Sequence, residues 1–165
     1  MSLLTTLQKR LKSAKKIAVL GVGSLLRGDD CAGVVTAKLL KKNRGKISTR
    51  RKMKVFIGET APENLTGAIR RFGPDHIIMI DAAQLAKPAG TVKLIDVKKA
   101  TGFSFSTHHL PLKVLGDYLV KDLGCEITVI GVQPRCCDFN VSPSKEIIQS
   151  TKVLARTICA AIFSL

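Results

Sequence analysis

The sequence predicts an α/β fold: a doubly wound, mostly parallel sheet of about five strands with helices on both faces, in a three-layer sandwich. Two observations lead to this prediction. Short apolar runs rich in branched residues alternate along the chain with segments whose apolar residues have helical spacing. Most of these runs are apolar at nearly every position, as in strands buried on both faces of a parallel sheet. Such a sheet is built with right-handed crossovers and carries its ligands at the carboxyl ends of its strands.

The length and composition predict a single domain over residues 1–165. Hydrophobic residues make up 45% of the chain and charged residues 24%, which is the composition of a globular protein. No apolar stretch reaches the roughly 18 residues that a membrane helix needs. The five cysteines form no C-x-x-C pair, and we interpret them as reduced, buried and inert thiols. The adjacent Cys136 and Cys137 leave a second interpretation open, in which the pair binds a soft metal or oxidises. These features predict a cytoplasmic protein that does not insert into membranes.

The first segment, residues 1–16, has the pattern of an amphipathic basic helix. Leu3, Leu7 and Leu11 recur at every fourth position, so they lie on one face of a helix. Lysine and arginine occupy many of the other positions, and the segment contains no acidic residue. We expect the leucine face to lie across the domain and the basic face to lie in water.

The first half of the chain then predicts two strands, each followed by a helix. Residues 17–22 form a buried strand, and residues 30–40 form a helix followed by basic residues, which suit the negative end of its dipole. Residues 53–57 form the second strand. The sequence from Thr60 to Glu63 matches the S/T-x-x-E capping box, so the second helix is expected to begin there.

The second half predicts three more strands and two helices. Residues 76–81 form an apolar strand that ends in a carboxylate. Residues 91–97 alternate in polarity, as expected of an exposed strand at the edge of a sheet. Residues 126–132 form the last strand. Leucines at helical spacing predict a helix that begins near Leu112, and residues 144–163 form a long closing helix.

The loop after the first strand holds two adjacent carboxylates, Asp29 and Asp30, at the start of a helix. Gly28 comes five residues after Gly23, so the glycines miss the dinucleotide-binding spacing. The two acids also stand where a phosphate-binding loop needs lysine and then serine or threonine. Acids in this position cap the helix or hold a cation. The residue pattern leaves open which of the two faces the sheet edge.

Asp81 and a pair of histidines supply the other polar groups expected at this edge. Asp81 ends an apolar strand, and His108 and His109 stand in a loop just before a helix. Two carboxylates and one imidazole, with coordination positions left open, suit nickel, zinc, manganese or iron. Either histidine fits this pattern. The third histidine, His76, begins its strand and is therefore expected at the opposite edge, as a surface or core residue.

Five short motifs resemble those of one protein family. They are GVGSLLRGDDCAGV, GETAPEN, IDAAQL, STHHLPL and GVQP, and they follow the order found in hydrogenase maturation endopeptidases of the HycI type. The resemblance covers nearly the whole chain and implies a doubly wound α/β fold. It also implies an enzyme that removes a C-terminal peptide from the large-subunit precursor of a nickel-iron hydrogenase after nickel has been inserted. The nickel is then supplied by the precursor.

The resemblance assigns roles to particular residues. It implies that Asp30, Asp81 and His108 contact the nickel and serve the cleavage reaction, rather than Asp29 and His109. No other cofactor is implied.

One segment departs from the family pattern. Relatives often have a carboxylate and two glycines before the segment like TAPEN, whereas this chain has Ile57, Gly58 and Glu59 there. We expect Glu59 to substitute for the missing acid. On this basis Gly58, Glu59 and Thr60 are predicted to contact the substrate.

The charge of the chain allows two other functions. Its 27 Lys and Arg against 12 Asp and Glu give a net charge of +15, which attracts acidic partners. One alternative is therefore a non-catalytic module that docks on an acidic protein or on nucleic acid. With one Tyr and no Trp, the chain has few side chains for stacking on bases, so we expect no nucleic-acid partner. The other alternative is a generic cytosolic metallopeptidase.

Overall fold

The computed structural model describes residues 2–43, 51–96 and 112–163, in which five strands form one sheet in the order β2-β1-β3-β5-β4. The strands are β1 (Lys16–Val22), β2 (Lys52–Glu59), β3 (His76–Ala82), β4 (Val92–Ile95) and β5 (Glu126–Val132). Neighbours are parallel except at the edge, where β4 runs antiparallel to β5. The predicted mostly parallel sheet is confirmed, and so is the position of β4 at its edge.

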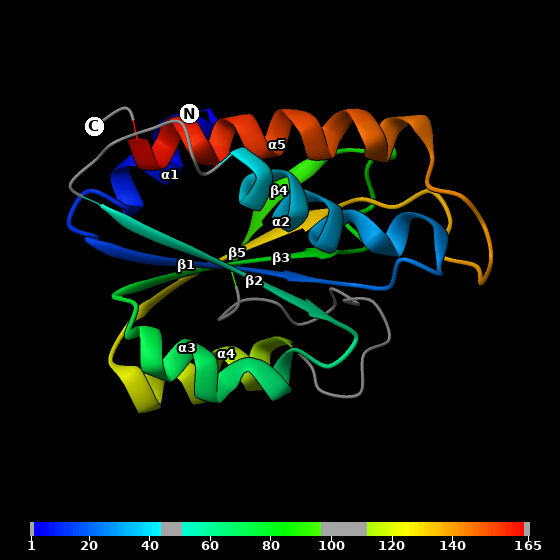
Figure 1. Cartoon of the computed structure of the whole chain (residues 1–165). Coiled ribbons are helices and arrows are strands. Elements are labelled where there is room, and N and C mark those ends of the chain that lie inside the picture. Colours follow the sequence, from blue (N-terminus) through cyan, green and yellow to red (C-terminus); the bar gives the residue numbers. More distant parts are fainter. Residues whose placement is uncertain (1, 44–50, 97–111, 164–165) are drawn as a thin grey trace.

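Helices cover both faces of the sheet (Figure 1). The helices on one face are α1 (Leu3–Arg10), α2 (Ala32–Asn43) and α5 (Lys145–Phe163). Those on the other face are α3 (Thr66–Phe72) and α4 (Leu112–Leu123). This arrangement confirms the predicted three layers. Among the described helices, none is long and apolar enough to cross a membrane.

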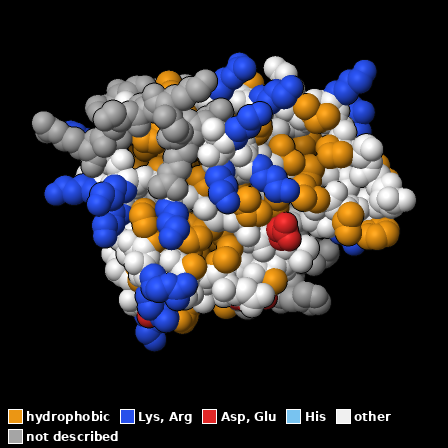
Figure 2. Space-filling model, in the orientation of Figure 1, with side chains coloured by type: hydrophobic (Ala, Val, Ile, Leu, Met, Phe, Trp, Pro, Cys, Tyr) orange, Lys and Arg blue, Asp and Glu red, His pale blue; other side chains and the backbone are white. Residues whose placement is uncertain are grey.

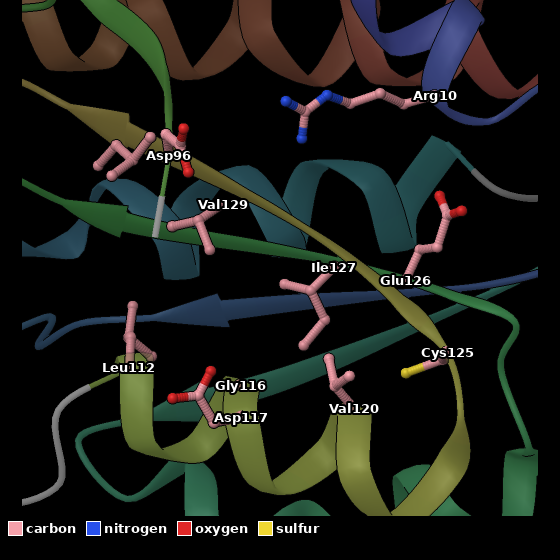
Figure 3. A pocket seen from close by; sticks show the side chains of 11 residues that line it. Arg10, Asp96, Leu112, Gly116, Asp117, Val120, Cys125, Glu126, Ile127 and Val129 are labelled. Carbon is pink, nitrogen blue, oxygen red and sulfur yellow. The ribbon is translucent and has the colours of Figure 1, made fainter. Parts of the chain in front are cut away.

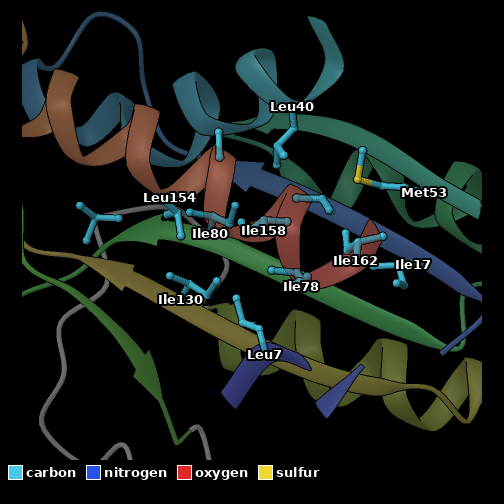
Figure 4. Packing of buried hydrophobic residues seen from close by; sticks show 14 of the residues in the cluster. Leu7, Ile17, Leu40, Met53, Ile78, Ile80, Ile130, Leu154, Ile158 and Ile162 are labelled. Atoms are coloured by element: carbon cyan, nitrogen blue, oxygen red, sulfur yellow. The ribbon is translucent and has the colours of Figure 1, made fainter. Parts of the chain in front are cut away.

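The position of β3 at the centre of the sheet explains why Ile77–Ile80 are all apolar and do not alternate with polar residues. All residues of β3 are buried, because side chains that point to opposite faces enter two different cores. Ile78 and Ile80 join the core under α1, α2 and α5 (Figure 4). Ile77 and Met79 join the core under α3 and α4.

The first helix is held by its leucine face, but it ends at Arg10 and not at residue 16 as predicted. Leu7 and Leu11 are fully buried, and α1 lies against α5. Leu7→Ala is expected to lower the free energy of unfolding by about 2–5 kcal/mol, because it leaves a cavity in the core. Lys9→Ala, on the exposed side of the same helix, should change it by less than about 0.5 kcal/mol. Denaturant unfolding compares the two, and equal values would contradict this packing.

The predicted capping box at Thr60 is wrong. A 3₁₀ turn, η3 (Pro62–Leu65), precedes α3, and it has Ala61 at its N-cap with no side-chain cap bond. The Ala61 N–H instead donates to Gly58 O at 3.1 Å. This closes a tight turn with Thr60 inside it, so the Thr60 side chain is exposed and caps nothing.

His76 lies at the amino end of β3, away from the expected ligand edge, and it is a buried core residue as predicted. Its Nε2 lies 2.8 Å from Thr128 Oγ1, and its Nδ1 lies 3.5 Å from Glu126 Oε2. Burial lowers the pKa of His76, and the charge of Glu126 opposes this shift. The unfolded chain therefore binds the His76 proton more tightly than the folded protein does.

This shift gives a prediction for the pH dependence of stability. The contribution of neutral His76 is complete above its unfolded pKa of about 6.5, and it is lost as the pH falls toward the lower folded value. Unfolding in urea should therefore become easier between about pH 7 and about pH 5.5. His76→Asn should flatten this dependence. An identical slope in the wild type and the variant would contradict the assignment.

Candidate active site

The loop after β1, residues 23–28, has a shape that requires its glycines. Gly23 has φ +133, and a Cβ there would lie 1.9 Å from Asp30 O. Gly28 has φ +48, and a Cβ there would lie 2.6 Å from Cys136 O. The glycines thus allow close backbone packing. A 3₁₀ turn, η1 (Gly28–Cys31), follows and leads directly into α2.

Asp30 lies in η1, just beyond the carboxyl end of β1, and only 2% of its surface is exposed. Its Oδ2 accepts a hydrogen bond from the Ser24 N–H at 3.0 Å. Its own N–H donates to Arg27 O at 3.0 Å. Asp30 therefore closes the loop that precedes it, and this fixes the position of its carboxylate.

Asp29 points to a different part of the chain and is also buried. Its Oδ2 accepts hydrogen bonds from the Arg135 N–H at 2.7 Å and from the Ser144 hydroxyl at 2.9 Å. Its Oδ1 accepts one from the Ser144 N–H at 2.6 Å. The Asp29 carboxylate thus accepts hydrogen bonds from the residue that precedes α5, a role that the residue pattern did not reveal.

Asp81 lies near the carboxyl end of β3, in the centre of the sheet, and is fully buried. Its Oδ1 accepts a hydrogen bond from the Ala82 N–H at 2.9 Å. Strand β3 pairs with β1 in parallel, with Gly21 opposite Ile80, and η1 packs against β3. The structure therefore brings Asp30 and Asp81 onto contacting elements at the same edge of the sheet, as the sequence predicted.

The predicted third ligand, His108, lies outside the described residues, and so does His109. Within residues 2–43, 51–96 and 112–163, no three His, Cys, Asp or Glu side chains gather as a group that could hold a metal. The triad of Asp30, Asp81 and His108 therefore stays a prediction.

The predicted substrate-binding segment lies beside the glycine-rich loop. Glu59 ends β2 with an exposed side chain and φ +48, and its carbonyl accepts a hydrogen bond from the Gly23 N–H at 2.9 Å. Gly58 is buried, and a Cβ there would lie 2.9 Å from Pro62 Cβ. Thr60 is exposed. Of the three residues, Glu59 and Thr60 thus offer side chains at the edge that carries Asp30.

Gln133, directly after β5, is a structural residue whose role the sequence did not show. It is 6% exposed, and its Oε1 accepts a hydrogen bond from the Leu85 N–H at 2.6 Å. Its Nε2 donates to Gln84 Oε1 at 2.9 Å. Gln133 therefore holds the loop that follows Asp81. Its position in the GVQP motif was the one feature of the sequence that pointed to a role for this residue.

Two thiols near the acidic pair are held in the protonated form. Burial raises the pKa of Cys137 to about 12, and the charges of Asp30 and Asp29 add to this effect. Burial likewise raises the pKa of Cys31 to about 11, with Asp29 as the next cause. Since the thiolate is the reactive form, neither cysteine is suited to act as a nucleophile at neutral pH. The prediction of buried thiols is confirmed for Cys31 and Cys125, whereas Cys136, Cys137 and Cys159 are partly exposed, so it is wrong for these three.

A cavity of about 410 Å³ lies toward the amino end of β5 (Figure 3). Apolar residues such as Val129 line it, together with the charged residues Arg10 and Glu126. Neither Asp30 nor Asp81 contributes to its wall. The cavity is therefore separate from the candidate active site.

The basic charge is spread over the surface. Figure 2 shows many Lys and Arg side chains and little acidic surface on one face. The exposed Lys and Arg side chains on α2, β2 and α3 are Lys38, Lys41, Lys42, Lys52, Lys54, Arg70 and Arg71. Some have partners, since Arg70 pairs with Asp122 and Lys54 lies over the Phe56 ring. Lysines along the edge strand β2 also discourage sheet-to-sheet association.

Comparisons with known proteins agree on one class. The family model described as HycI, hydrogenase maturation protease, matches residues 34–161. The hydrogenase 3 maturation protease of Escherichia coli is 33% identical over 73% of this chain and 74% of its own. A Methanocaldococcus jannaschii protein, provisionally named as a hydrogenase maturation protease, is 34% identical over 93% of this chain and 92% of its own.

The solved structures extend the agreement to the fold. The crystal structure of the [NiFe] hydrogenase maturation protease HycI from Thermococcus kodakarensis superposes with a TM-score of 0.83 at 29% identity. It covers 95% of this chain and 98% of the other. The fold and the sequence thus define a peptide-bond hydrolase of the hydrogenase maturation class. The chain belongs to the HycI family of hydrogenase maturation proteases.

Proposed function

We propose that this enzyme removes the C-terminal extension of a nickel-iron hydrogenase large-subunit precursor after nickel insertion, in the cytoplasm. Asp30, Asp81 and His108 contact the nickel of the precursor in this proposal. The observation that carries it is the pair of buried carboxylates, Asp30 and Asp81, on contacting elements at the carboxyl edge of the sheet. Ligands of open parallel sheets bind at this edge.

The chemistry of the pair favours a cation. Asp30 and Asp81 each bring a carboxylate with almost no exposure to this edge. Carboxylate oxygens together with an imidazole are ligands that suit a borderline divalent ion such as nickel. Three ligands leave positions free, which groups of the precursor would fill. The metal is then part of the substrate.

This arrangement makes the metal a checkpoint for cleavage. A precursor without nickel lacks the ion that the two carboxylates and the imidazole would contact, so it would bind weakly and be cleaved slowly. Glu59 and Thr60, which border the same edge, would contact the polypeptide near the ion. Recognition of nickel thus precedes hydrolysis.

The test is to incubate the purified protein with large-subunit precursors from the same organism, each prepared with and without nickel. We expect one cleavage near the C-terminus of a nickel-loaded precursor, detected by mass spectrometry. The nickel-free form of that precursor should stay intact. Cleavage of both forms at equal rates would refute the role of nickel, and cleavage of unrelated proteins would indicate a generic peptidase.

A further inference from the structure

The Asp29 carboxylate has no part in the proposed contact with nickel, yet the structure engages it closely. Three hydrogen bonds reach it from Arg135 and Ser144, and 1% of its surface is exposed. The Ser144 Oγ also accepts a hydrogen bond from the Ile147 N–H at 3.3 Å, which caps α5. Asp29 therefore ties the glycine-rich loop to the first turn of the longest described helix.

Backbone hydrogen bonds join the same two segments. The Asp29 N–H donates to Cys136 O at 2.9 Å, and the Gly28 N–H donates to Val141 O at 3.0 Å. In the other direction, the Asn140 N–H donates to Leu26 O at 2.7 Å. Residues 23–31 and 135–144 thus form one connected unit, and the side chain of Asp29 is the buried charge within it.

Asp29 and Asp30 are neighbours in a 3₁₀ turn. Such a turn has three residues per revolution, so successive side chains point about 120° apart. Asp29 reaches outward to Ser144, while Asp30 reaches back across its own loop to the Ser24 N–H. A shift of the peptide between them would move both carboxylates together.

We propose that Asp29 is a positioning residue, which fixes Asp30 for the reaction by anchoring η1 to residues 135–144. This inference rests on the proposed function, which gives Asp30 its role. A carboxylate suits the position because it offers two acceptor oxygens to three donors. An amide offers one oxygen, and its NH₂ group would face donors. Asp29→Asn therefore preserves the shape of the side chain but not its hydrogen bonds.

The first readout is processing of the nickel-loaded precursor. Asp29→Asn is expected to lower kcat/KM per folded molecule about 100-fold, because small displacements of reacting groups have effects of this size. Asp138→Asn is the matched control, since its exposed carboxylate contacts Cys136 and not η1. It should process at the wild-type rate. A wild-type rate in folded Asp29→Asn would overturn the proposal.

The second readout needs no substrate. The amide proton of Ser24, which donates to Asp30 Oδ2 at 3.0 Å, reports the position of Asp30 in NMR spectra of the free protein. It should shift in Asp29→Asn and not in Asp138→Asn. An unchanged Ser24 signal in Asp29→Asn would refute positioning. If the wild type processes no precursor, the proposed function is wrong. The Ser24 amide signal in Asp29→Asn would still show whether Asp29 positions Asp30.

A milder variant covers the case in which Asp29→Asn does not fold. Ser144→Ala removes one of the three donors to Asp29, together with the cap of α5, and it keeps the other two donors, so a smaller shift of the Ser24 amide is expected. Ser150→Ala is its control, because it removes a hydroxyl on the same helix that donates to Gly90 O and does not contact Asp29. Equal Ser24 signals in both variants would contradict the anchor.

Discussion

Under the proposed function, Asp81→Asn is expected to reduce processing of the nickel-loaded precursor by a factor of about 100 or more, since it would remove a charged contact to the nickel. Asp81 is fully buried in the central strand, where its Oδ1 accepts the hydrogen bond of the Ala82 N–H. The amide retains the volume of the side chain, so the sheet should still form. Gel analysis of the precursor over time measures the effect.

The control separates loss of contact from loss of fold. Asp122→Asn changes a partly exposed carboxylate on α4, which pairs with Arg70 on the other side of the sheet from η1. It should process the precursor at the wild-type rate. Circular dichroism and thermal unfolding establish that both variants fold. If folded Asp81→Asn processes the precursor at the wild-type rate, Asp81 is not part of the site. The same test applies to His108→Ala, for which we expect a comparable loss.

Gly33→Ala is expected to lower the free energy of unfolding by about 3 kcal/mol or more, because the close approach of α2 to the sheet leaves no room for a methyl group. A Cβ at Gly33 would lie 2.1 Å from Ile80 O and 2.3 Å from Val22 O. Both are backbone atoms of neighbouring strands, so the clash cannot be relieved by rotating a side chain.

The same substitution should also impair processing. Gly33 follows η1 by two residues, and Ile80 precedes Asp81, so a displaced α2 moves the element that carries Asp30 away from the strand that carries Asp81. Gly67→Ala on α3 is the control. Its nearest neighbour is the Arg71 guanidinium at 3.7 Å, and alanine there should stabilise the helix by about 0.5–1 kcal/mol. Equal stability of the two variants would contradict the packing of α2.

The fold was predictable because its strands are buried in different ways. Strand β3 is buried on both faces, and Ile77–Ile80 within it are all apolar, whereas β4 at the edge is partly exposed. The continuous apolar run of β3 therefore indicated a central strand, and the mixed polarity of residues 91–97 indicated an edge strand. The start of α3 was not predictable, since Thr60 and Glu63 match a capping box by residue type alone. The turn that Glu59 makes with φ +48 places Thr60 outside the helix.

The candidate site was predictable in part. The carboxyl ends of β1 and β3 had to meet, so Asp30 and Asp81 were expected on one edge, and the structure places them there. Residue type could not separate Asp29 from Asp30. The difference between them depends on Ser144, which is distant in sequence and adopts its position only when α5 packs beside η1. Long-range contacts of this kind leave no local signal.

The central claim, that Asp30, Asp81 and His108 complete the coordination of nickel held by the precursor, is tested most directly by X-ray absorption at the nickel edge. The nickel-loaded precursor is measured alone and in a rapidly frozen mixture with the enzyme. We predict that the mixture shows added nitrogen and oxygen ligands at nickel, and that mixtures with Asp81→Asn or His108→Ala show fewer of them. A nickel spectrum that the wild-type enzyme leaves unchanged would contradict the claim.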